Sequence, residues 1–163
     1  FKIGTMKDNF DIYSKKVMRY FTHPKNMGSI KNADSTATIG NPRCGDVMKV
    51  FLKISKRLSK SKIKNQKSKI EEEYIKDIKV QTLGCGAAIA TSSIATEMVK
   101  GKSLKEALKI SNKEIVKKLG GLPKVKYHCS LLAEQGIKKA IYKYLNNTGS
   151  TKNNAKIQMS NDN

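Results

Sequence analysis

The sequence is short of several features that mark common protein classes. Its 163 residues include no tryptophan, and aromatic residues make up only 6%, which is little material for a surface that stacks nucleic-acid bases. It has no apolar run of the roughly 18 residues that a membrane-spanning helix needs. Its three cysteines are odd in number, widely spaced and without a C-x-x-C motif. They predict no disulfide framework and favour a reducing compartment.

Positive charge is the largest excess in the composition. Lysine and arginine number 33 against 13 acidic residues, a net charge of +20 with neutral histidines. Such an excess favours nucleic acid or another anionic surface as a partner. The densest basic segment, 56–70, has seven bases and no acid, but no aromatic residue or recognition motif among them. We therefore expect an extended or disordered surface loop there, and we do not expect nucleic acid to be the partner.

The length and the polarity of the C-terminus predict one domain followed by a tail. A chain of 163 residues is the size of a single domain. Residues 147–163 are polar and lack a hydrophobic stripe, so we expect this tail to be disordered. The predicted domain therefore spans residues 1–146, with the basic loop at 56–70 as an insertion.

Hydrophobic periodicity predicts an α+β fold. Apolar spacing indicates a helix over 10–21, strands around 50–54 and 78–82 on either side of the basic loop, a helix over 87–99 and a last helix over 130–145. Ser103 with Glu106 and Ser111 with Glu114 form two capping boxes, each of which opens a short helix. Strands followed by helices favour a small antiparallel sheet with the helices packed on one face.

Each cysteine lies where one structural element gives way to another. Cys44 is in a turn before a strand, Cys85 lies between two glycines before a helix, and Cys129 follows His128 at the start of the last helix. The free amides of a helix N-terminus lower the pKa of a thiol, so we expect thiolates at Cys85 and Cys129. Their separations of 41 and 44 residues require a site assembled by the fold. Three thiolates with Asp46 or His128 supply the ligands of a zinc or iron–sulfur site.

Three separated segments strengthen this interpretation: 44–49 (CGDVMK), 84–90 (GCGAAIA) and 126–134 (KYHCSLLAE). Together, and in this order, they resemble the iron–sulfur cluster assembly scaffolds of the IscU type, which are related to the N-terminal domain of NifU. The likeness continues through 13–17, 23–29 and 96–103 and runs from about Tyr13 to Asn146.

The resemblance implies a role for each candidate ligand. It implies that Cys44, Cys85 and Cys129 hold a nascent [2Fe–2S] cluster, with Asp46 and His128 as alternative fourth ligands. In this family a zinc ion often occupies the same ligands in the isolated protein. The resemblance also implies that sulfur arrives as a persulfide on Cys129, and that the protein is a scaffold rather than an enzyme.

The resemblance also implies partners and a location. Sulfur comes from a cysteine desulfurase, frataxin and a ferredoxin take part, and an Hsp70 with its J-protein promotes transfer to apo iron–sulfur proteins. One segment resembles the Hsp70 recognition motif: Leu122, Pro123, Lys124, Val125 and Lys126. No membrane partner is expected. Because the chain begins at Phe1, we expect a mitochondrial matrix protein whose transit peptide has been removed, with the cytoplasm as the alternative.

Two alternatives use the same residues. A thiol enzyme would use Cys129 as the nucleophile and His128 as its base, although adjacent residues at a helix start rarely aim at one another. A structural zinc domain would need the metal to fold and would carry no sulfide chemistry. Lys126, two residues before His128, is a candidate to offset the charge of the thiolates.

Overall fold

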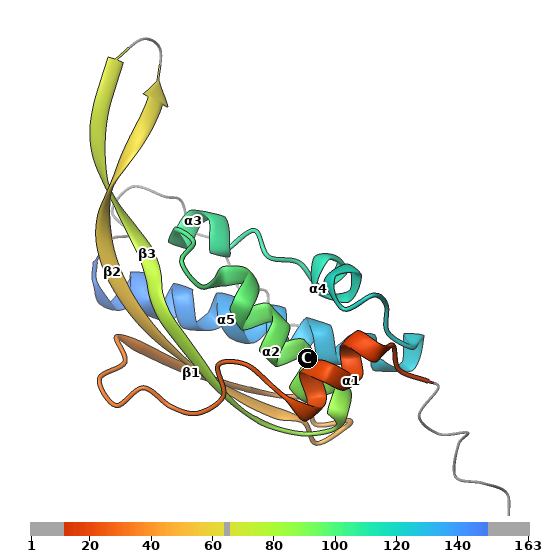
Figure 1. Ribbon diagram of the computed structural model, residues 1–163. Helices are drawn as coiled ribbons and strands as arrows, with labels where there is room; N and C mark the ends of the chain where they lie inside the picture. The colour runs from red at the N-terminus through yellow and green to blue at the C-terminus, as the bar shows by residue number, and fades with distance from the viewer. Residues whose placement is uncertain (1–11, 64–65, 150–163) are drawn as a thin grey trace, which may run out of the picture.

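The computed structural model describes residues 12–63 and 66–149. Its elements, labelled in Figure 1, are α1 (Lys15–Thr22), β1 (Ser35–Gly40), β2 (Val47–Ile63), β3 (Gln66–Leu83), α2 (Gly86–Val99), α3 (Leu104–Ala107), α4 (Asn112–Lys118), the 3-10 helix η1 (Lys124–Lys126) and α5 (Tyr127–Asn147). None of the helices in this part of the chain is long and apolar enough to cross a membrane.

The strands form one antiparallel sheet in the order β1–β2–β3. Val50 lies opposite Ala37 of β1 and Val80 of β3, so most of the buried side chains of the three strands share one face, while Phe51 is buried on the other. Helix α5 packs against β1 and β2, and α2 packs against β3, on the face of Val50 (Figure 1). The predicted α+β fold is confirmed, with β1 added to the two predicted strands.

Backbone groups on both outer strands of the sheet are bound by the rest of the chain. On β3, the amide of Val80 donates to the carbonyl of Asn26, and its carbonyl accepts from the amide of Gly28. Likewise, the carbonyl of Ile75 accepts from the amide of Gly101, and its amide donates to the carbonyl of Lys102. On β1, two lysines of α5 act as donors. Lys139 Nζ donates to the carbonyl of Thr38 and Lys143 Nζ to that of Thr36, each at 3.0 Å.

Helix α2 lies at the centre of the domain, between α1, α5 and β3. Ten of its 14 residues are buried, and most of them are alanine, serine or threonine. Small side chains let neighbouring elements approach closely, and their buried hydroxyls bond within the helix: Thr91 Oγ1 donates to the carbonyl of Ala87 at 2.8 Å. The prediction of a helix over 87–99 is confirmed.

The other helices follow the predicted signals, with shifted ends. Both capping boxes are present and open α3 and α4. Helix α1 begins at Lys15, after the N-cap Ser14, and the predicted start at Phe10 lies outside the described residues. Helix α5 runs from Tyr127 to Asn147 and so begins before the predicted Ser130. Of the predicted tail, Asn147 is helical, and 150–163 lie outside the described residues.

The expectation of a loop over 56–70 is wrong. Strands β2 and β3 continue through this segment as one antiparallel hairpin up to the pair Ile63 and Gln66, with 64–65 outside the described residues. The start of this segment forms a strand because it pairs with an acidic stretch of β3, which the composition of 56–70 does not reveal. Three acids on β3, residues 71–73, lie opposite residues 56–58 of β2, of which Lys56 and Arg57 are bases, and Arg57 Nε contacts Glu72 at 3.2 Å. Opposite charges on neighbouring strands stabilise the start of this extension, whereas beyond Ser59 lysines lie opposite lysines, Lys60 with Lys69 and Lys62 with Lys67.

Candidate metal centre

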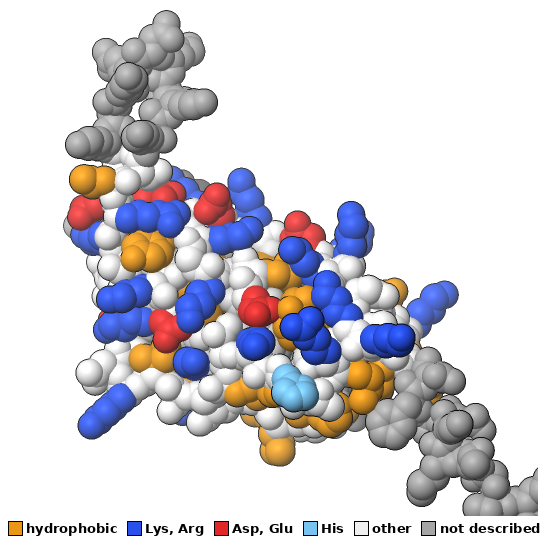
Figure 2. Space-filling model, in the orientation of Figure 1, with side chains coloured by type: hydrophobic (Ala, Val, Ile, Leu, Met, Phe, Trp, Pro, Cys, Tyr) orange, Lys and Arg blue, Asp and Glu red, His pale blue; other side chains and the backbone are white. Residues whose placement is uncertain are grey.

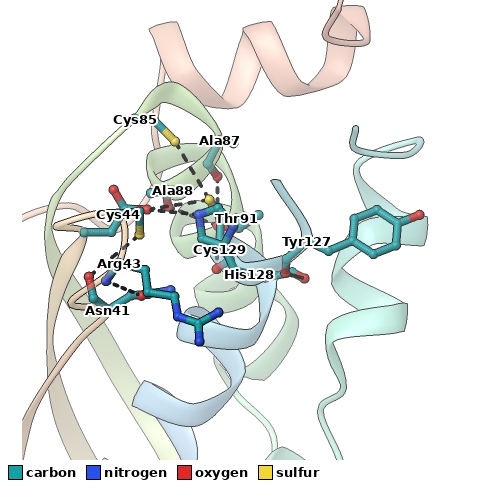
Figure 3. Close-up of polar contacts among 12 residues, drawn as sticks. Asn41, Arg43, Cys44, Cys85, Ala87, Ala88, Thr91, Tyr127, His128 and Cys129 are labelled. Atoms are coloured by element: carbon teal, nitrogen blue, oxygen red, sulfur yellow. Dashed lines mark hydrogen bonds and ion pairs between the residues drawn. The ribbon is translucent and has the colours of Figure 1, made fainter. Parts of the chain in front are cut away.

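Three segments that are distant in sequence meet at one end of the sheet, beside the N-terminus of α2. They are the loop from β1 to β2, the junction of β3 with α2, and the first turn of α5. Figure 3 shows Cys85 pointing toward Cys129, whereas the thiol of Cys44, in the first segment, is turned toward Asn41. The fold thus brings together the five predicted ligands: Cys44, Asp46, Cys85, His128 and Cys129.

The loop that carries Cys44 is closed by its own backbone. The amide of Gly45 donates to the carbonyl of Asn41, and the amide of Asn41 donates to the carbonyl of Asp46, both at 2.8 Å. Gly45 has a φ of 72°, a conformation that favours glycine. The Cys44 thiol is exposed and lies 3.8 Å from the carbonyl oxygen of Asn41. It is therefore the cysteine of the site that solvent reaches most easily.

Asp46 is the buried acid of the site. Asp46 is 3% exposed. It lies one residue before β2, and its side chain is buried like that of Met48, two residues later. A Cβ atom on Gly84 would lie 2.5 Å from Asp46 Oδ1, so only glycine at position 84 leaves room for this carboxylate. This role of Gly84 was not predicted from the sequence, because the signal is a contact between residues 38 positions apart.

Cys85 and Cys129 form the inner part of the site. Cys85 is the N-cap of α2, and its Sγ lies 3.8 Å from the Sγ of Cys129 in the first turn of α5. Cys129 Sγ also lies 3.6 Å from Asp46 Oδ2. Cys129 packs against Ala87 and Ala88 and is 1% exposed, whereas Cys85 is half-buried.

Burial decides the protonation of Cys129. Removal from water raises the pKa of its thiol well above the ordinary value, and the nearby Cys85 and Asp46 raise it further. The expectation of a thiolate at Cys129 is therefore wrong for the metal-free protein, because desolvation outweighs the effect of the helix N-terminus. A metal ion that binds here must displace this proton.

Asp46 links two overlapping groups of ligand atoms. Cys44, Asp46 and His128 form one group and Asp46, Cys85 and Cys129 the other, with the atoms of each group within 4.8 Å of one another. His128 Nε2 lies 3.9 Å from Asp46 Oδ2. Ligands on one tetrahedral zinc or iron, with metal–ligand bonds of about 2.0–2.3 Å, stand roughly 3.3–3.8 Å apart. The two shortest separations, 3.6 and 3.8 Å, meet this requirement without rearrangement.

Lys126 lies beside the inner thiols. The charge of Cys85, followed by that of Tyr13, raises the pKa of the Lys126 ammonium. This proximity supports the prediction that Lys126 offsets thiolate charge. Tyr13 was not predicted to belong to the site, yet it packs with Cys85 and Leu122 against Cys129.

The segment 122–126 adjoins the centre. Its first residue, Leu122, packs against the Cys129 cluster, and Lys124, Val125 and Lys126 form η1. The Val125 side chain is 75% exposed although it is apolar. The structure thus presents an accessible apolar side chain three residues before the candidate ligand His128.

Comparison with known families decides the identity of this arrangement. The family model described as "NifU-like N terminal domain" matches residues 12–151. The chain belongs to this family. The resemblance found in the sequence is confirmed, and the five candidate ligands lie within the matched NifU-like domain.

Proteins with curated names share this NifU-like domain over most of their length. The chain is 46% identical over 138 residues to "Iron-sulfur cluster assembly scaffold protein IscU 1" of Archaeoglobus fulgidus, covering 85% of this chain and 80% of that protein. It is 46% identical over 140 residues to "Iron sulfur cluster assembly protein 1" of Trachipleistophora hominis, covering 84% and 89%. Another relative is the IscU scaffold of Rickettsia prowazekii, 45% identical over 135 residues and covering 81% and 91%.

Solved structures share the fold of the NifU-like domain. The putative scaffold protein for the SUF system from Fervidobacterium islandicum superposes with a TM-score of 0.58 at 22% identity, covering 82% of this chain and 98% of that one. The NifU-like protein from Brucella abortus gives 0.56 at 18% identity, covering 83% and 96%. At these identities the likeness establishes the architecture.

Proposed function

We propose that the protein is a scaffold on which a labile [2Fe–2S] cluster is assembled from iron and desulfurase-derived sulfur and then transferred to apo-proteins. The observation that carries the proposal is the set of three cysteines around the buried carboxylate of Asp46. The names of the relatives, which describe scaffolds of iron–sulfur cluster assembly, support the same role rather than an enzymatic one.

The ligand set suits a centre that binds and then releases its cargo. A site that retains a cluster permanently usually has four cysteines. Here the inner cysteines have one carboxylate as their neighbour, and the third cysteine is on an exposed loop. A hard oxygen ligand holds soft iron–sulfur species less firmly than a thiolate does. We propose Asp46 as the ligand that controls release and His128 as its alternative.

The same residues also fit zinc in the isolated protein. Two thiols, a carboxylate and an imidazole are all zinc ligands, and zinc prefers four of them in a tetrahedron. Zinc bound at this centre would be a resting state, because the scaffold must free its ligands for iron.

Cys129 is the proposed acceptor of sulfur as a persulfide. Because Cys129 is only 1% exposed, delivery requires the 41–46 loop or the first turn of α5 to move aside. Cys44 is the exposed thiol of the same site. An experiment that traps the persulfide should therefore compare the sulfur bound to Cys129 with that bound to Cys44.

The proposed partners follow from this role. They are a cysteine desulfurase, frataxin, a ferredoxin, apo iron–sulfur proteins, and an Hsp70 with its J-protein. We propose 122–126 as the Hsp70 segment, with exposed Val125 as its apolar anchor. We propose the mitochondrial matrix as the location. One relative, 42% identical over 136 residues, is named a mitochondrial assembly protein in Debaryomyces hansenii.

Anaerobic reconstitution tests the assembly role. The protein is incubated with iron, cysteine and a desulfurase, and visible absorption and circular dichroism are recorded. We expect a [2Fe–2S] spectrum that is lost in Cys85→Ser and Cys129→Ser and reduced in Cys44→Ser. The absence of a cluster, or a cluster indifferent to all three substitutions, would falsify the proposal.

Transfer kinetics test the role of Asp46 in release. Asp46→Ala should slow cluster loss to an apo-ferredoxin, because the exchangeable oxygen ligand is gone. Asp77→Ala is the matched control, since Asp77 is a half-exposed acid paired with Lys100 at 2.7 Å on the sheet. Equal transfer rates in the Asp46 variant and the unaltered protein would remove Asp46 from this role.

A further inference from the structure

A groove of about 900 Å³ lies apart from the metal centre. It is formed by the C-terminal end of α2, the residues around α3, helix α4 and one residue of α1. None of the five candidate ligands lines it. In Figure 2 blue side chains gather around an orange patch over α2, α4 and α1, in the region of these lining residues.

The groove combines an apolar floor with a basic rim. Met98, Val99 and Ile110 are the apolar lining residues; Val99 and Ile110 are buried, so the half-buried Met98 is the one that a ligand can contact. Around them are five exposed lysines: Lys16, Lys102, Lys109, Lys117 and Lys118. Three glutamates also line the groove, which leaves an excess of two positive charges by formal count, five minus three.

The lysines and the glutamates of the groove differ in their partners. Each glutamate already accepts a hydrogen bond within the domain: Glu97 from the Tyr20 hydroxyl, Glu106 from Ser103 and Glu114 from Ser111. The two serine contacts belong to the capping boxes of α3 and α4. In residues 12–63 and 66–149, by contrast, no ion pair or side-chain hydrogen bond involves any of the five lysines.

We propose that this groove is a docking surface for a partner protein, and that it takes an acidic peptide segment carrying an apolar side chain. Two of the glutamates are held in helix caps and Glu97 is held by Tyr20, but all three keep their negative charge, so the excess of two lysines is what attracts an acidic ligand. Carboxylates of the segment pair with the rim, and an apolar side chain between them contacts Met98, the partly exposed residue of the floor. A small phosphate compound would match the rim and leave the floor unused.

Charge complementarity at a groove of this kind raises the rate at which the partner associates and fixes how the partner is aligned when bound. Exposed lysine–carboxylate pairs contribute little individually, so the floor must supply part of the affinity. The interaction should therefore weaken with salt yet persist in part at high ionic strength, since screening acts on the rim and leaves the apolar contact. This surface goes beyond the proposed scaffold role, and it does not depend on a bound cluster.

A peptide-binding experiment on the full chain tests the proposal. The probe is a short fluorescent peptide that alternates Glu and Leu, its counterpart is the same peptide with Gln in place of Glu, and inorganic tripolyphosphate is the third ligand. Anisotropy gives affinities, and amide chemical shifts locate binding on the unaltered protein. We expect the Glu/Leu peptide to bind and to shift amides near 98–99 and 109–118.

Two double variants with equal changes in net charge separate the groove from general attraction. K109E/K117E changes the rim, whereas K105E/K113E changes exposed lysines of α3 and α4 that do not line the groove. We expect the first to weaken peptide binding at least about tenfold and the second less than about twofold. Thermal unfolding of both variants checks that the fold is intact.

Four outcomes would overturn the proposal. They are no binding of the Glu/Leu peptide, equal binding of the Gln/Leu peptide, equal weakening by both double variants, and lysine-dependent binding of tripolyphosphate alone. The metal content of each variant is measured in parallel. Failure of the scaffold role would appear there and in reconstitution, and failure of the docking surface would appear only in peptide binding.

Discussion

The metal centre and the far half of the β2–β3 hairpin use charge in opposite ways. At the centre one carboxylate, Asp46, is 3% exposed and lies within reach of all three thiols. Along the hairpin the charges are many but exposed, and the ion pair from Lys56 Nζ to Glu71 Oε2 measures 3.5 Å between side chains that are 59% and 62% exposed. Exposed pairs of this kind contribute about 0–1 kcal/mol. Burial, more than the number of charges, marks the chemical site.

The largest expected effect comes from the inner thiols. Cys85→Ser or Cys129→Ser should lower zinc affinity at least about a hundredfold, because each removes a ligand from the buried group. Cys44→Ser should lower it less, since Cys44 lies at the exposed edge of the site. Competition with a chromophoric chelator measures these affinities.

Folding of the metal-free variants is the control for this test. A serine hydroxyl in the place of Cys129 is buried and costs roughly 1–3 kcal/mol if it finds no partner, so thermal unfolding is recorded beside each titration. If Cys44→Ser costs more zinc affinity than both inner variants, the distinction between the inner and outer ligands is wrong.

Gly84→Ala should have the next largest effect. The new Cβ would lie 2.5 Å from Asp46 Oδ1, so the carboxylate must shift, at a cost of about 1–3 kcal/mol in the free energy of unfolding. Zinc affinity should fall about tenfold as the shared ligand moves. Denaturant unfolding and zinc titration measure the two changes.

Gly40→Ala is the matched control. Gly40 ends β1 close to the same loop, but its added Cβ would meet only ordinary contacts at 3.6 Å. The comparison fails if both alanines weaken zinc binding equally, because the effect would then reflect the loop rather than the contact with Asp46.

Alkylation should rank the three thiols in the metal-free protein. We expect iodoacetamide to modify Cys44 first, Cys85 second and Cys129 last, with at least about tenfold between first and last. Cys129 is buried and holds its proton, while Cys44 is exposed. Mass spectrometry of timed samples gives the rates. Fast modification of Cys129 would show that the first turn of α5 opens readily.

Shortening the hairpin should have the smallest effect. Replacing 60–69 with an Asn-Gly turn keeps the pair Ser59 and Ile70 and the anchor from Arg57 to the carbonyl of Gly101. We expect cluster assembly and zinc affinity within about twofold of the unaltered protein, because exposed charges contribute little. Loss of assembly in the reconstitution assay would place the basic segment in the functional machinery.

Local signals in the sequence predicted much of the fold and all five candidate ligands. The capping boxes and the small-residue helix depend on neighbouring residues, so Ser103, Ser111 and the start of α2 could be predicted. The pKa of the Cys129 thiol depends on the groups that surround it in three dimensions. Its position at a helix N-terminus predicted a lowered pKa, whereas burial raises it. Lys56 and Arg57 at the start of the basic segment pair with acids that follow the segment in the sequence, and a count within 56–70 does not reveal these acids.

The contacts on the two outer strands have a consequence for solubility and folding fidelity. A bare strand edge invites pairing with another chain, and long hairpins are prone to it. Here the backbone groups of Val80 and Ile75 form hydrogen bonds with other segments of the same chain. Lys139 and Lys143 donate hydrogen bonds to carbonyls of β1. These contacts protect the part of the sheet beside the helices against edge-to-edge pairing, and α5, which also carries Cys129 of the candidate metal centre, provides those on β1. Beyond Leu52, where β1 no longer pairs with β2, exposed charges on the hairpin serve the same purpose.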